Sequence, residues 1–213
     1  MPLAAMQSCL TELYGFELEY CINDFLITDR KLAQVLGGSK RERDEELLIV
    51  EEADGAAVSL FLEQELIDRL ECDDPIAALS HHNLADFLVA FEGVSHFTYF
   101  AFKASRDQCV SLLELELQAE VDKFITAATL IGRQYERMPA RLHEWLFALP
   151  RLHQDLSEPE IERYEQANNY AARFCERLWP RLRKKAGGDS LRRELRHFYR
   201  LPREHKIGYI EAG

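Results

Sequence analysis

Four glutamates and one histidine lie near one another in the sequence and together could hold a divalent metal ion. They are Glu92, His96, Glu114, Glu116 and Glu120. Carboxylate oxygens and a neutral imidazole are ligands that suit Mg²⁺, Mn²⁺ or Zn²⁺. A metal held there would lower the pKa of a bound water molecule and promote hydrolysis, for example of a phosphate ester. The alternative is a polar sheet face of alternating glutamates, with His96 as an ordinary neighbour.

Other familiar catalytic motifs are missing from the chain. Gly93 to His96 begins like the serine-hydrolase motif G-x-S-x-G, but Phe97 stands where the second glycine is required. Neither G-x-G-x-x-G nor G-x-x-x-x-G-K-[ST] occurs, so nucleotide binding by such loops is not indicated. The five cysteines include no C-x-x-C pair, which favours reduced thiols in a cytoplasmic protein.

The stretch that contains most of the candidate ligands has the pattern of a β-hairpin followed by a helix. Residues 96–102 are rich in aromatic side chains, which favour strands. Leucines then alternate with polar residues over 113–118, as in a strand with one face in water. Matching polarity across this hairpin places His96 beside Glu116. From Ala119 onward, apolar residues recur with helical spacing.

A single helix from Ser111 onward is the competing interpretation. Ser111 and Glu114 match the S-x-x-E capping box that begins many helices. On such a helix the three leucines would be scattered around the circumference. The sheet would then lose its second half, and we would expect the grouping of acids with His96 to be lost too.

The first part of the chain is predicted to supply a three-stranded antiparallel meander. Alternating residues over 16–22 indicate the first strand. Two apolar runs flank Asp54-Gly55, which suits a type I′ turn and predicts a hairpin over 47–62. One face of this hairpin carries Leu47, Ile49, Val58, Leu60 and Leu62.

Helical spacing and capping residues predict the remaining elements. Helices are expected over 3–13, 63–70, 83–93, 119–135, 157–180 and 190–200. The predicted fold class is therefore α+β: an antiparallel sheet, made of the meander and the hairpin, packed with helices and followed by an α-helical C-terminal extension. The predicted boundaries are an α+β domain over 1–137 and a helical extension with a basic C-terminal segment over 138–213. This order of elements is similar in layout to the small acidic chaperones of type III secretion, although no sequence motif accompanies the similarity.

Charge is distributed unevenly along the chain. The net charge is −11, yet residues 173–206 are strongly basic. Four arginines of this segment could bind nucleic acid or an acidic partner: Arg192, Arg193, Arg196 and Arg200. The alternative is an amphipathic helix that docks its apolar side chains, Leu191, Leu195, Phe198 and Leu201, on the acidic body.

These observations favour a cytoplasmic, non-enzymatic protein that works as a binding, adaptor or chaperone-like module, with a protein partner or a second copy of itself. Two alternatives are a metal-dependent hydrolase of phosphate esters and nucleic-acid binding through the basic segment. No cofactor is expected other than a divalent metal at the glutamate and histidine cluster. A membrane partner is not expected, because no apolar run approaches the roughly 18 residues of a membrane span, and the first residues lack a basic leader of a secretory signal.

Overall fold

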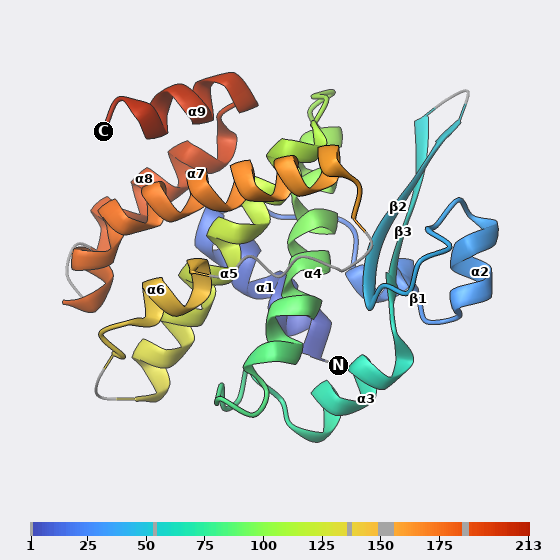
Figure 1. Cartoon of the computed structure of the whole chain (residues 1–213), viewed down its shortest axis with the longest axis horizontal. Coiled ribbons are helices and arrows are strands. Elements are labelled where there is room, and N and C mark those ends of the chain that lie inside the picture. Colours follow the sequence, from blue (N-terminus) through green and yellow to red (C-terminus); the bar gives the residue numbers. More distant parts are fainter. Residues whose placement is uncertain (1, 53–54, 136–137, 149–155, 185–187) are drawn as a thin grey trace.

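The computed structural model describes residues 2–52, 55–135, 138–148, 156–184 and 188–213. Helices dominate this part of the chain, with a small sheet at one side (Figure 1). The elements, in order, are α1 (Pro2–Tyr14), a 3₁₀ turn (Ile22–Phe25), β1 (Leu26–Ile27), α2 (Arg30–Val35), β2 (Glu45–Glu52), β3 (Gly55–Leu62), α3 (Gln64–Cys72), α4 (Leu84–Ala104), α5 (Leu112–Gln134), α6 (Leu142–Phe147), α7 (Glu158–Arg183), α8 (Gly188–Arg200) and α9 (Arg203–Glu211).

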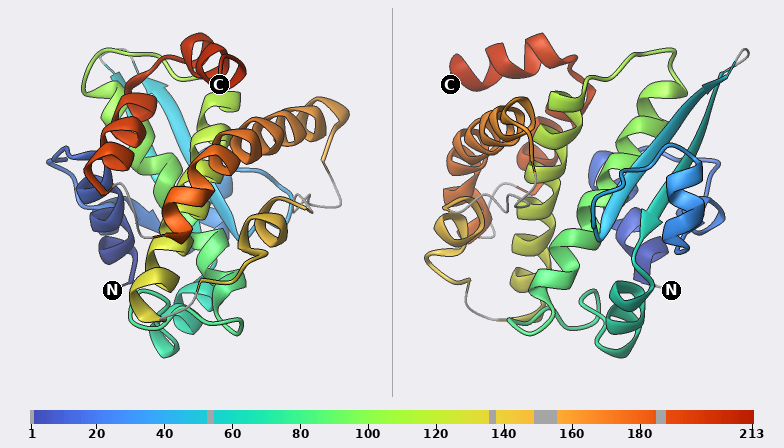
Figure 2. Two further views of the ribbon diagram at one scale, coloured as in Figure 1. Left: turned by 90° about the vertical axis from the view of Figure 1, so that its left-hand side faces the viewer. Right: turned by 45° about the vertical axis from the view of Figure 1, so that its right-hand side comes forward.

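The long helices α4 and α5 form the centre of the molecule. They run antiparallel, so that Ser95 of α4 bonds Asp122 of α5 while Tyr99 bonds Glu114. The sheet covers one side of α4, and α7 packs along α5 on the other side (Figure 2). One continuous hydrophobic cluster extends from α1 to α9. The helices after residue 138 therefore bury their apolar faces in the same core as the first part of the chain.

The predicted antiparallel meander is wrong, because the sheet is mixed and its strand order is β1-β3-β2. β1 pairs in parallel with β3, and residues 16–22 form no strand. The side chain of Gln7 explains why: it donates to the Tyr20 carbonyl and accepts from the Ile22 amide, so it bonds backbone groups that a strand would have used.

The predicted hairpin at 47–62 is confirmed. β2 and β3 are antiparallel, with Leu47 opposite Leu60 and Ile49 opposite Val58. Residues 53–54 of the turn lie outside the described residues. One face of the hairpin packs on the main core, while the other face, with Leu48, packs on α2.

The second predicted hairpin, over 96–118, is also wrong, because both stretches are helical. The side chain of Ser111 accepts a hydrogen bond from the Glu114 amide and begins α5, as the competing interpretation required. The alternation of leucines and glutamates led to a wrong strand prediction, because the glutamate positions do not form a face in contact with water. Leu117 and Glu116 are both buried, since α5 is surrounded by α4, α7 and their neighbours.

Gly93 does not end a helix, as the sequence suggested, but lies inside α4. A Cβ atom at this position would stand 2.7 Å from Cγ of Glu45 and 2.8 Å from Cδ1 of Leu60. The missing side chain therefore lets the sheet lie directly on α4. This close approach also brings Glu45 of β2 to the side of His96.

The C-terminal helices follow their capping signals more closely. A capping box between Ser157 and Glu160 begins α7, which continues through Pro180 to Arg183 instead of ending at the proline. Pro202 separates α8 from α9, a helix that the sequence pattern did not predict.

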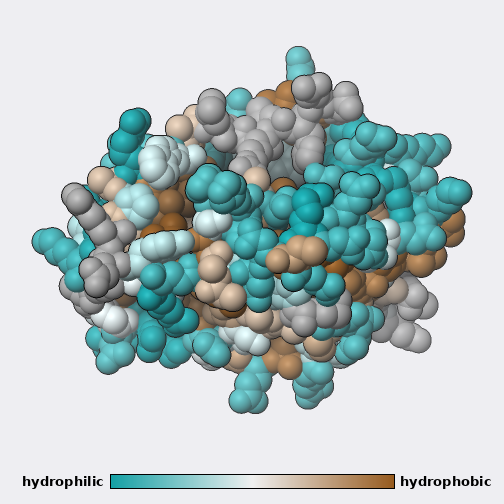
Figure 3. All heavy atoms as spheres, turned by 90° about the horizontal axis from the view of Figure 1, so that it is seen from below, coloured by the Kyte–Doolittle hydropathy of each residue, from teal (hydrophilic) through white to brown (hydrophobic). Residues whose placement is uncertain are grey.

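Hydrophilic residues cover much of the molecular face in Figure 3, with smaller apolar patches between them. No described helix is both long and apolar enough to cross a bilayer.

Candidate metal centre

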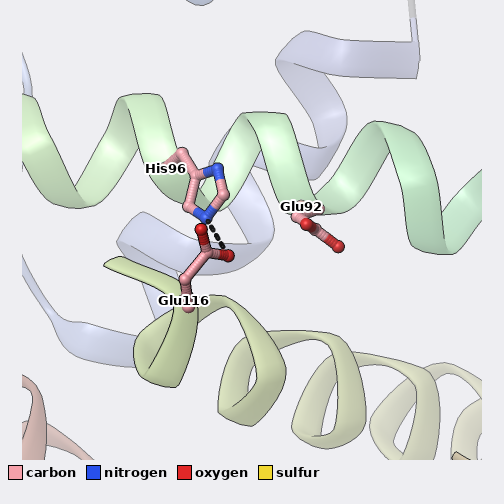
Figure 4. A group of neighbouring side chains, drawn as sticks. All are labelled: Glu92, His96 and Glu116. Carbon is pink, nitrogen blue, oxygen red and sulfur yellow. Dashed lines mark ion pairs between the residues drawn. The ribbon is translucent and has the colours of Figure 1, made fainter. Parts of the chain in front are cut away.

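The α4–α5 pair brings three of the five candidate ligands together. Glu92 and His96 are four residues apart and so lie on one face of α4. Glu116 lies opposite them on α5 (Figure 4). One ligand atom from each residue can be chosen so that all three atoms lie within 4.8 Å of one another. Metal–ligand bonds of about 2.0–2.2 Å require ligand atoms no more than about 4.4 Å apart, so the three side chains would have to close in slightly for one small cation to contact them all.

His96 lies between two carboxylates from different elements. Its Nδ1 is 3.4 Å from Oε1 of Glu45, and its Nε2 is 3.5 Å from Oε2 of Glu116. Burial alone would lower the pKa of His96, but the carboxylates of Glu116 and Glu45 raise it well above its ordinary value. The side chain is more than nine-tenths buried, and Nε2 makes no hydrogen bond within the described part of the chain.

Lys123 forms ion pairs with both Glu92 and Glu120. Its ammonium lies 2.6 Å from Glu92 and 2.7 Å from Glu120. Burial opposes the charge of the lysine, but Glu120 and Glu92 outweigh it and raise the pKa of Lys123. Burial also raises the pKa of Glu120. Glu120 therefore lies beside the metal candidates and is connected to Glu92 through the lysine.

Arg163 borders the same cluster, whereas Arg43 pairs with a carboxylate outside it. Nε of Arg163 in α7 is 3.9 Å from Oε1 of Glu116. Arg43, just before β2, pairs with Glu160 at 3.0 Å. The Nε atoms of both arginines are buried without a hydrogen-bond partner among the described residues. Arg163 thus keeps an unused donor beside Glu116.

Glu114 does not belong to this group, contrary to the prediction. It accepts a hydrogen bond of 2.5 Å from the Tyr99 hydroxyl and lies 3.2 Å from the Lys103 ammonium. On a strand, Glu114 and Glu116 would share a face. On a helix two positions rotate the direction by about 200°, so the two side chains point to nearly opposite sides.

The predicted proximity of His96 and Glu116 is confirmed, although the predicted strands were wrong. The expectation that a helical α5 would abolish the acid–imidazole grouping was also wrong, since two antiparallel helices produce it. Sequence reasoning missed Glu45, Lys123 and Arg163. Lys123 had a local signal, because it lies three residues after Glu120, whereas the other two reach the cluster only through long-range packing.

The four arginines of the basic segment fall into two groups. Arg196 donates to the Leu13 carbonyl, and Arg200 donates to the Tyr14 carbonyl at the end of α1. These two side chains satisfy carbonyls at a helix C-terminus. The side chains of Arg192 and Arg193 are exposed and have no hydrogen bond or ion pair with another described residue. Leu191, Leu195 and Phe198 of the same helix are buried, as the docking alternative predicted.

A second polar network lies on another side of the α4–α5 pair and is closed to solvent. Asp122 accepts hydrogen bonds from Tyr14, Ser95 and Gln118. Lys206 of α9 donates to Gln118 and lies 4.3 Å from the ring centre of Tyr99. Burial raises the pKa of Asp122 to about 6 and lowers the pKa of Lys206 to about 7.

Comparison of the chain with protein-family models, with curated proteins and with solved structures finds no match.

Proposed function

We propose that Glu92, His96 and Glu116 bind a divalent cation, and that the protein uses it to hydrolyse a phosphate ester. The observation that carries this proposal is the convergence of the three ligand atoms within 4.8 Å. The mix of two carboxylates and one imidazole suits Mn²⁺ or Zn²⁺. The side chain of Glu92 is 24% exposed, so a hydrated ion can reach the cluster from solvent.

Binding of a divalent cation requires that the cluster first lose a positive charge, the proton of His96. Four carboxylates, those of Glu45, Glu92, Glu116 and Glu120, face three cations, those of His96, Lys123 and Arg163. His96 must lose a proton before its Nε2 can coordinate a metal. Entry of the ion thus replaces the proton of His96 with a larger positive charge, in a group that already carries one more carboxylate than cations.

The arginines suggest why the substrate would be a phosphate ester. Guanidinium groups bind phosphate oxygens through paired N–H donors. Arg163, which borders the cluster, and Arg43 each have a buried Nε donor without a hydrogen-bond partner in the described part of the chain. Glu92, His96 and Glu116 would hold the ion, and the ion would supply an activated water for attack on phosphorus with cleavage of the ester P–O bond. Glu120, whose pKa burial raises, would take the proton of that water, and solvent would protonate the leaving alkoxide.

Titration calorimetry with Mn²⁺ and Zn²⁺ tests the metal site directly. We expect saturable binding to the wild-type chain, binding weakened at least about tenfold in Glu116→Gln, and no change in Glu165→Gln, an exposed control on α7. Hydrolysis of p-nitrophenyl phosphate should require the metal and fail in Glu116→Gln. Absence of binding heat in the wild type, or equal affinity in Glu116→Gln, would rule out the metal centre.

A second candidate, a protein-binding role, is favoured by the surface of α2. This short helix packs Ala33 against the sheet, yet Leu32 and Val35 on its outer side are 46% and 81% exposed. A helix that is apolar on both sides is normally covered on both. We propose that a second copy of the chain covers this side. Sedimentation velocity should show a dimer that the double variant Leu32→Lys/Val35→Lys dissociates and that Gln34→Lys leaves intact. A wild-type monomer at high concentration would contradict this role.

A further inference from the structure

A groove lies between α1, α5 and α8, away from the metal candidates. It holds about 170 Å³ of space. Its lining residues are Cys9, Glu12, Leu13, Ile125, Thr126, Thr129, Leu130, Arg133, Leu182, Gly188, Leu191, Arg192 and Leu195. None of the residues of the proposed metal centre contributes to it.

The groove combines an apolar floor with cations. Ile125, Leu130 and Leu195 are buried and form part of the lining. Arg133 of α5 and Arg192 of α8 also line the groove, and both are exposed. Neither guanidinium has a hydrogen bond or ion pair with any other residue that the structure describes. The lining contains one carboxylate, that of Glu12, so cations outnumber acids.

We infer that this groove binds the carboxylate form of a short fatty acid, with its chain on the leucine floor and its head group at Arg133 and Arg192. An alkyl chain gains from leaving water for an apolar surface, and a carboxylate matches the fork of a guanidinium. The net positive lining disfavours an amine of the same chain length. Arg192, which the sequence marked as a candidate for an acidic partner, thus receives a small anion in place of a macromolecule.

Cys9 offers a reporter inside the groove. Its thiol lines the groove and is partly exposed, and burial raises its pKa while Arg133 lowers it. Cys175 is fully buried, so a variant with serine at Cys21, Cys72 and Cys109 leaves Cys9 as the reactive thiol. Alkylation of Cys9 by iodoacetamide then reports whether a ligand covers it.

The test compares octanoate with octylamine and octanol, which share the chain length and differ in the head group. Octanoate should slow alkylation of Cys9 and bind by calorimetry, whereas octylamine should do neither. The double variant Arg133→Gln/Arg192→Gln should bind octanoate at least about tenfold more weakly. The control Arg193→Gln, on the exposed side of α8, should bind it as the wild type does. Equal protection by octylamine or octanol, undiminished binding in the double variant, or no protection by octanoate would each overturn the inference.

Discussion

Gly93→Ala tests whether the close contact between α4 and the sheet determines the stability of the molecule. Two opposing effects can be compared. Replacing glycine by alanine inside a helix normally stabilises it by about 1 kcal/mol. The new Cβ would however stand 2.7 Å from Cγ of Glu45 and 2.8 Å from Cδ1 of Leu60, a side chain with no exposed surface.

Overpacking of a buried contact costs about 1–3 kcal/mol. Two contacts below 3 Å place Gly93→Ala near the upper end of that range, because neither neighbour can move freely. Cγ of Glu45 is not the end of its side chain, and its carboxylate is held by His96. The free energy of unfolding should therefore fall by about 1–2 kcal/mol, after subtraction of the gain in helix propensity.

Thermal and urea unfolding provide the assay. For a chain of this size we expect Tm to fall by about 2–8 °C. The matched control is Gly208→Ala in α9, where a Cβ meets no atom within 4 Å, so only the helix term acts and Tm should rise. If Gly93→Ala is as stable as the wild type while Gly208→Ala behaves as expected, the argument from close packing is refuted.

Three further predictions concern the central helices. Ser111→Ala removes the side chain that caps α5 and should cost about 1 kcal/mol in urea unfolding; Ser111→Asp, which keeps an acceptor, should restore most of this loss, and equal stability of all three proteins would argue against the cap. Lys123→Gln removes the ammonium that competes for Glu92, so calorimetry should show at least about tenfold tighter Mn²⁺ binding, and weaker binding would contradict this role. The pKa of Asp122 is raised from 3.8 to about 6 in the folded chain, so its contribution to stability is full below pH 3.8 and is lost as the pH rises through about 6. This amounts to about 3 kcal/mol, and Asp122→Asn should remove that part of the pH dependence; an unchanged pH profile of unfolding would show that another group causes it.

The sequence predicted those parts of the fold in which local chemistry decides the structure. The hairpin around Asp54-Gly55 has a turn signal, an alternating face and a fixed register. The capping residues Ser111 and Ser157 mark helix starts because a short-range hydrogen bond forms there. In each case the informative contacts lie within a few residues of one another.

Prediction failed for the central helices because they are surrounded by protein. A helix that is covered on several sides loses the apolar stripe by which helices are recognised. Glu116 and Leu117 are both buried, so the alternation of polarity carried no information about solvent. The partner of His96 on the sheet, Glu45, is separated from it by 51 positions, and no local pattern connects the two residues. Three of the five candidate ligands nevertheless converge, since Glu92 and His96 lie four residues apart on α4 and Glu116 lies opposite them on α5.

The Lys206 ammonium lies among Tyr99, Phe198 and Gln118, and this position has a consequence for folding during translation. One acceptor on α5, Oε1 of Gln118, is bonded by a residue that is synthesised after both central helices. During translation, this acceptor therefore has no ammonium donor until Lys206 of α9 has been made. The polar interior beside α4 and α5 is thus completed by α9, which follows both helices in the chain.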